Sequence, residues 1–189
     1  PFAIALGAYN AQIGFLTSIP NLFSPLAQLI TGKIFKKIKS RKKIISIFII
    51  LQALMWIPLA LLPFIIDHNQ ITYLIILFTI IVSLGAFILP IWSSLMGDLI
   101  NPNHRGEYFG NRNSIAGLVS IVFSLVAAFV LDKFSAKLFY AFAGLFLTAC
   151  IARLISAYLL KKHYEPKFYF SKKEDVQFSH FIKKIKNTK

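Results

Sequence analysis

The sequence contains five apolar stretches long enough to cross a membrane, and short polar segments separate them. Residues 32–44, which follow the first stretch, hold seven cations and no acid. A cationic segment between two apolar spans is typical of a short loop on the cytoplasmic side of a membrane. The five apolar stretches predict an all-α transmembrane protein that crosses the bilayer several times. The position of this loop then sets the direction of every other span.

The lengths of the apolar runs set the expected spans. Residues 44–66 would reach about 35 Å at about 1.5 Å per residue, enough to cross a hydrocarbon core of about 30 Å. Residues 1–8 are apolar but too short to span, so we interpret them as the last turns of a preceding helix. Restoring that helix predicts a six-helix half-bundle with its first helix mostly missing. We expect a membrane bundle over residues 1–164, with spans at about 11–30, 44–66, 71–97, 108–131 and 138–160, and the start of a basic cytoplasmic linker at 165–189.

The charge distribution also indicates a membrane protein. Hydrophobic residues make up 57% of the chain and charged residues only 15%, whereas soluble chains are roughly a quarter charged. The net charge of +14 comes mainly from residues 32–44 and from the tail after Leu160. Contacts with lipid head groups explain these two blocks better than nucleic acid does, so we expect the lipid bilayer as a partner and no nucleic acid.

The expected outer turns carry few cations, which fits the same orientation. Residues 67–70 have none, and the turn at 132–137 has only Lys133 and Lys137. The basic loop and the C-terminal tail are therefore expected in the cytoplasm. Within the tail, Phe178, Phe181, Ile182 and Ile185 recur at helical spacing. They indicate either an amphipathic segment on the inner membrane surface or a disordered linker.

Residue types that carry catalysis are scarce in the expected spans. All four histidines fall in loops or in the tail, and the single cysteine, Cys150, lies within an apolar run. The sequence has no paired carboxylates, zinc-ligand spacing or phosphate-binding glycine loop. We therefore expect no enzyme activity, no cofactor and no metal site.

Two segments, residues 32–44 and 98–110, carry motifs that resemble those of the major facilitator superfamily. The basic segment is similar to the family's signature loop between its second and third helices, through Gly32-x-Ile34-Phe35-x-Lys37, Arg41-Lys42 and Ile44. The loop between the expected third and fourth full spans is similar to the family's acid-x6-Arg-Gly motif, through Asp98, Arg105-Gly106 and Gly110. Two departures are clear: Lys36 replaces the acid of the first motif, and the drug-antiporter glycine-proline motif is absent from residues 108–131.

The resemblance implies the N-terminal half of a twelve-span carrier of small molecules, which works by alternating access with a missing C-terminal six-helix half. It also implies two groups of site residues. The expected inner gate or charge network comprises Gly32, Arg41, Lys42, Asp98, Arg105, Gly106 and Arg112. The candidates for a substrate cavity are Asn21, Gln28, Trp92, Ser93, Ser94 and Asn113, each of which could instead form hydrogen bonds between helices or anchor an interface.

Asp98 ends its span on the same side as the basic loop, so it is expected to pair with a cation there. Arg41 is the preferred partner because its planar guanidinium can grip a carboxylate through two hydrogen bonds; Arg105 and Arg112 are alternatives. The expected location is the plasma membrane. The alternative to a carrier is a membrane structural or assembly protein with a similar layout.

Overall fold

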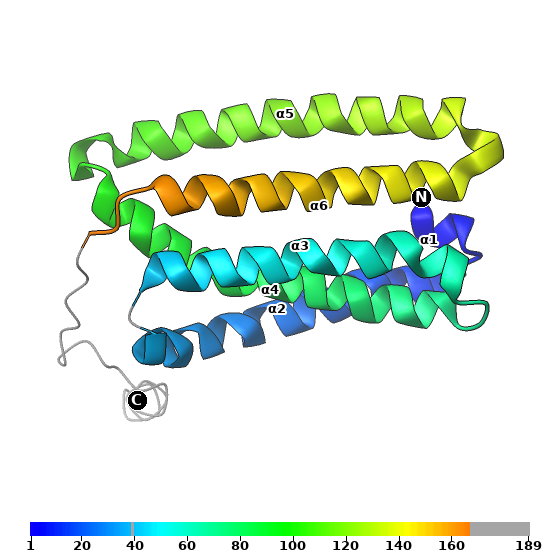
Figure 1. The fold of residues 1–189 in the computed structure, drawn as a ribbon, viewed down its shortest axis with the longest axis horizontal. Coiled ribbons are helices and arrows are strands. Elements are labelled where there is room, and N and C mark those ends of the chain that lie inside the picture. The colour runs from blue at the N-terminus through cyan, green and yellow to red at the C-terminus, as the bar shows by residue number, and fades with distance from the viewer. Residues whose placement is uncertain (39, 167–189) are drawn as a thin grey trace, which may run out of the picture.

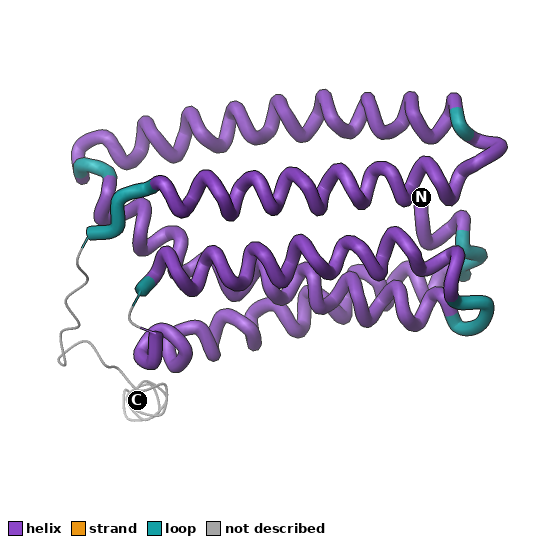
Figure 2. Tube along the Cα trace, in the orientation of Figure 1, coloured by secondary structure: helices purple, strands orange, loops and turns teal. Residues whose placement is uncertain are grey.

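The structure, a computed structural model, describes residues 1–38 and 40–166. The described chain is almost entirely helical and contains no strand (Figure 2). Five long helices run along the molecule, and short connections join them (Figure 1). They are α2 (Asn10–Ile38), α3 (Arg41–Ile65), α4 (Gln70–Leu99), α5 (Arg105–Lys133) and α6 (Leu138–Lys162); the short elements are α1 (Phe2–Ala5), η1 (Pro102–His104) and η2 (Ser135–Lys137).

All five long helices are long and apolar enough to cross a membrane, so the predicted all-α membrane fold is confirmed. The four-residue helix α1 occupies the segment interpreted as the end of a preceding helix. Residues 167–189, including the expected amphipathic segment, lie outside the described residues.

The prediction of a loop across residues 32–44 is wrong in its extent. Helix α2 continues to Ile38, eight residues past the expected end at Ile30, and α3 already begins at Arg41. Lysine is a good helix former, so a basic sequence can prolong a helix beyond the apolar part of its span. The Ser40 side chain accepts a hydrogen bond from the Lys43 backbone N–H and thereby caps the start of α3.

Helix α3 is at the centre of the bundle. It packs against α4 on one side and α6 on another, and α2 packs against α4 (Figure 1). Ten residues of α3 are buried, whereas none of α5 is. Helix α5 runs beside α6 with few contacts, and Leu118 and Leu125 on α5 are 66% and 67% exposed. Lipid tails are as apolar as leucine, so such exposure costs little in a bilayer.

Small and polar residues bring α2, α3 and α4 close together. Gln52 of α3 is 4% exposed and donates a 2.8 Å hydrogen bond to the Ile81 carbonyl of α4. Gly85 lies one turn further along α4, and a Cβ there would come within 2.9 Å of the Gln52 amide nitrogen. Thr31 of α2 donates to the Phe87 carbonyl at 3.1 Å. These contacts match the way helices pack in membranes, through small residues and interhelical hydrogen bonds.

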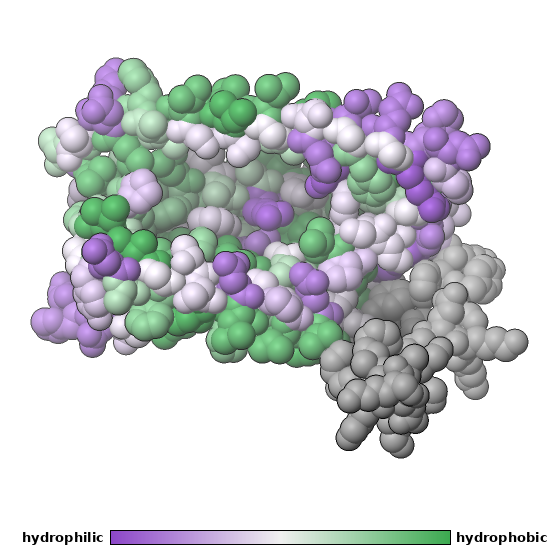
Figure 3. Space-filling view, turned by 180° about the vertical axis from the view of Figure 1, so that it is seen from behind, coloured by the Kyte–Doolittle hydropathy of each residue, from purple (hydrophilic) through white to green (hydrophobic). Residues whose placement is uncertain are grey.

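The face opposite to the view of Figure 1 is hollowed along its length (Figure 3). Hydrophobic surface dominates the middle of the molecule, and hydrophilic residues gather toward its two ends. We name one of these ends the cation-rich end: α3 begins there, α4 and α6 finish there, and Arg41, Lys42, Arg105 and Lys162 belong to it.

Candidate functional site

A buried arginine at the cation-rich end joins α3 to α4. Arg41 is the first residue of α3 and is only 1% exposed. Its Nη1 lies 2.6 Å from Oδ2 of Asp98, in the last turn of α4, and the Asp98 side chain is 46% exposed. The pairing of Arg41 with Asp98 that the sequence predicts is therefore present. A hydrogen bond between two charged groups at this distance is among the stronger ones in proteins.

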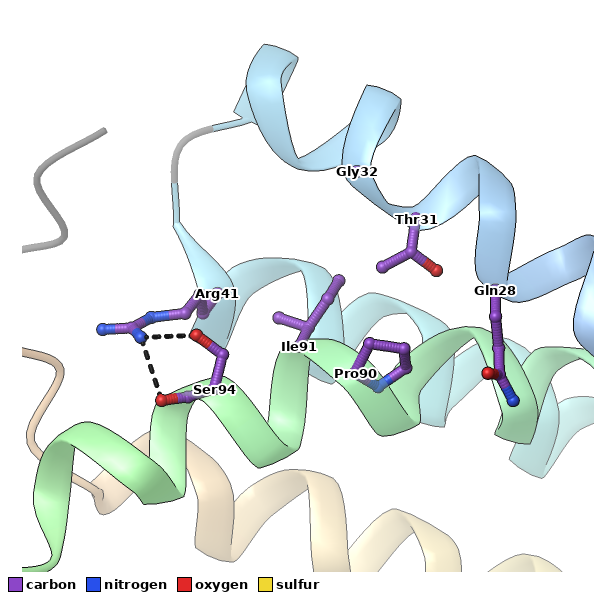
Figure 4. A pocket seen from close by; sticks show the side chains of 7 residues that line it. All are labelled: Gln28, Thr31, Gly32, Arg41, Pro90, Ile91 and Ser94. Atoms are coloured by element: carbon purple, nitrogen blue, oxygen red, sulfur yellow. Dashed lines mark hydrogen bonds between the residues drawn. The ribbon is translucent and has the colours of Figure 1, made fainter. Parts of the chain in front are cut away.

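The guanidinium connects α3 to two other segments. Nη1 also donates to Ser94 of α4, to the carbonyl at 3.2 Å and to Oγ at 3.1 Å (Figure 4). Nη2 donates instead to the Pro166 carbonyl, beyond α6, at 3.3 Å. The expected grip of both nitrogens on Asp98 is thus wrong, because the second nitrogen faces the segment after α6. We call Arg41, Ser94, Asp98 and Pro166 the arginine joint.

The segment after α6 also caps the start of α3. Both carboxylate oxygens of Glu165 accept hydrogen bonds there, from Ser40 Oγ at 2.9 Å and from the Lys42 backbone N–H at 3.2 Å. Lys42 Nζ donates to the His163 carbonyl at 2.7 Å. The first N–H groups of a helix lack partners within it, and a carboxylate beside them is stabilising. Lys42 was expected in the charge network with Asp98. In the structure it contacts the segment after α6 instead.

Sequence reasoning missed Glu165. Its isolation could have drawn attention to it, because it is the first acid after Asp132 and follows Lys161 and Lys162. That isolation singles out the residue but does not indicate that it contacts the start of α3.

A recess of about 210 Å³ lies beside the arginine joint (Figure 4). Helix α2 contributes Gln28, Thr31 and Gly32 to it, so Gln28 is near the gate candidates. A Cβ at Gly32 would meet no atom within 4 Å. The other lining residues are Arg41, Pro90, Ile91 and Ser94.

Arg105 is engaged away from Asp98. Its Nε donates to the Ile100 carbonyl at 3.3 Å, and its Nη2 donates to the Gly97 carbonyl. A cation at a helix C-terminus is favourable because the last carbonyls lack partners within the helix. Arg105 therefore caps α4 and ties it to the start of α5. Gly106 is exposed in the first turn of α5, and a Cβ there would meet no atom within 4 Å.

Arg112, Trp92 and Asn113 come together between α4 and α5. The Arg112 guanidinium carbon lies 4.3 Å from the centre of the Trp92 ring, and its Nη1 donates to Asn113 Oδ1 at 3.0 Å. The sequence predicted Trp92 and Asn113 for the cavity and Arg112 for the gate, so the structure joins residues from both groups. Asn21 and Ser93 are exposed, and no described contact joins either of them to another candidate.

Five membrane-length helices and a charge cluster at one end define a multi-pass integral membrane protein. The chain matches the family model of the Major Facilitator Superfamily over residues 1–189 and belongs to that family. The family comprises transporters rather than enzymes, so the function is of the transporter type. No curated protein and no solved structure matches the chain.

Proposed function

We propose that the protein is the N-terminal half of a twelve-span secondary carrier, which moves small solutes across the plasma membrane by alternating access. The arginine joint supports this proposal most directly. It connects two helix ends and a following segment through one buried cation, whose partner Asp98 is 46% exposed. An ionic contact that water can reach at one side can break and re-form as a conformational equilibrium shifts.

In this mechanism two six-helix halves rock around a site near the middle of the membrane. The arginine joint keeps α3, α4 and the start of the linker together at the cation-rich end. It thereby favours the state in which that end is closed. Gly32 and Gln28 line the recess beside the joint, where opening would first admit water.

The proposed orientation places the cation-rich end in the cytoplasm, because positive charge collects there. Labelling in sealed vesicles tests it in a Cys150→Ala background, since Cys150 is the only cysteine. His68→Cys and Asn103→Cys place exposed thiols at opposite ends of α4. We expect an impermeant maleimide added outside to modify position 68 and to spare position 103 until the membrane is permeabilised. The reverse pattern would overturn the orientation.

Transport itself is tested in proteoliposomes supplied with a mixture of small metabolites, whose lumen is analysed by mass spectrometry. Six helices can form only one wall of a site between two halves. The complete twelve-span carrier should therefore accumulate specific solutes, whereas residues 1–189 as a monodisperse monomer should accumulate none. Uptake by the monomer would refute the half-carrier proposal. If the complete protein takes up nothing from the mixture, a structural or assembly role gains support instead.

A further inference from the structure

Arg112 is a fixed charge inside a membrane span. It lies seven residues after the start of α5, about 10 Å along the helix, within the candidate span Pro102–Lys133. Charged residues within candidate membrane spans are usually kept where they have a partner or a function.

No described acid pairs with Arg112. Asp98 pairs with Arg41 at 2.6 Å, and Glu107 lies 3.6 Å from His104 at the exposed start of α5. The described contacts of Arg112 are the Trp92 ring and the Asn113 side-chain oxygen. One face of the guanidinium stacks on Trp92, and one of its N–H groups donates to Asn113. These two contacts orient it, and its other donors bond to no described residue. Such an arrangement leaves a planar set of donors that matches a carboxylate.

A recess beside Arg112 combines a cation with an apolar wall. It has a volume of about 710 Å³ and includes Arg112, with polar neighbours Tyr108 and Asn111 on the same helix. Further along α5 its wall consists of Ile115, Ala116 and Val119. Small-molecule sites typically pair a mostly apolar lining with a few polar groups that fix orientation.

A second charged residue in the recess restricts the ligand further. Glu107 also lines it, 3.6 Å from His104, and would repel a second negative charge on a ligand held at Arg112. We propose that Arg112, oriented by Trp92 and Asn113, anchors an organic anion with one carboxylate and an apolar body. This inference rests on the proposed transport function and names the class of solute.

Tryptophan fluorescence tests the site directly, because Arg112 stacks on one of the two tryptophans. In a Trp56→Phe background the signal comes from Trp92 alone. Protein in neutral detergent is titrated with benzoate, with benzyl alcohol as the uncharged analogue. We expect a saturable change with benzoate and at least about tenfold weaker binding of benzyl alcohol. Arg112→Gln should weaken benzoate binding at least tenfold, and Arg112→Lys should fall between the two.

Lys133→Gln is the matched control, because it removes one cation from the other end of α5. It should bind benzoate like the parent protein. Asn113→Ala keeps the charge of Arg112 but removes the side-chain oxygen that accepts its hydrogen bond, so benzoate binding should weaken about threefold to tenfold. This variant also tests the site if Arg112→Gln does not fold. Equal binding of benzoate by parent and Arg112→Gln, or equal binding of benzoate and benzyl alcohol, would overturn the proposal.

A lipid phosphate could also neutralise Arg112, and vesicles distinguish it from a soluble anion. A Trp92 response to phosphatidylglycerol vesicles, with none to benzoate, would identify a lipid contact and overturn the proposal. Because binding is measured without a gradient, this outcome leaves the transport proposal intact. Conversely, a protein that binds benzoate but never accumulates solute would contradict transport and retain the site.

Discussion

Asp98→Asn is expected to open the cation-rich end and to reduce transport by the proposed twelve-span carrier. The substitution removes the negative charge 2.6 Å from Arg41 and leaves a 1% exposed guanidinium with neutral acceptors. Breaking a fully buried pair costs about 3–5 kcal/mol and an exposed pair contributes about 1 kcal/mol or less. Because Asp98 is 46% exposed, we expect about 1–3 kcal/mol, which shifts a two-state equilibrium by roughly 5-fold to 150-fold.

A cysteine in the neighbouring recess reports this shift. Gln28→Cys, in the Cys150→Ala background, places a thiol beside the arginine joint. The Asp98→Asn variant should increase its rate of modification from the cation-rich side while membrane insertion stays unchanged. Asp132→Asn removes an exposed acid from the far end of α5 and should alter neither property. Unchanged labelling and transport in Asp98→Asn would show that Asp98 is only a hydrated charge at the end of its helix.

The structure predicts poor rescue by a charge swap. Asp98→Arg together with Arg41→Asp restores one acid and one cation, and considered as charges alone this pair would recover part of the lost function. An aspartate at position 41, however, cannot donate to the carbonyls of Ser94 and Pro166 that Arg41 serves. It would also lie near the Glu165 carboxylate, which the neighbouring Ser40 and Lys42 contact.

The sequence predicted the Arg41–Asp98 pair because span polarity alone places both residues at the same end of the bundle. No detailed packing is needed for that step. The hydrogen bonds of Glu165 depend instead on how α6 ends relative to α3, more than 120 residues earlier in the chain. Such a long-range cap has no local sequence signature, unlike the Ser40 cap, which lies three residues from its partner.

The cavity candidates were harder to predict, because residue type does not fix the rotation of a membrane helix. Gln28 lies in the recess of the arginine joint, whereas Trp92 and Asn113 contact Arg112. Asn21 is exposed on α2. An apolar helix in lipid can present almost any face outward at little cost, so hydropathy separates spans but does not assign their faces.

Arg41→Lys is expected to disrupt the arginine joint more widely than Asp98→Asn does. The two terminal nitrogens of Arg41 serve different segments: Nη1 serves Ser94 and Asp98, and Nη2 serves Pro166. A lysine ammonium is a shorter-reaching point charge and cannot hold both positions at once. It is also more strongly hydrated, so burying it at a 1% exposed site costs more. The substitution should therefore release the segment after α6 as well as weaken the contact with α4.

Hydrogen exchange at the start of α3 separates the two variants. The Lys42 amide donates to Glu165, so its protection requires the segment after α6 to stay in place. We expect Arg41→Lys to speed exchange of this amide by roughly fivefold or more, equivalent to about 1 kcal/mol of local opening, and to impair transport. Asp98→Asn should change this exchange less, because the Pro166 contact of Arg41 survives. Lys43→Arg alters an exposed neighbour and should leave exchange as in the parent protein. Equal exchange in Arg41→Lys and the parent would show that Glu165 holds the segment after α6 without help from Arg41. The arginine joint would then consist only of the contacts between Arg41 and α4.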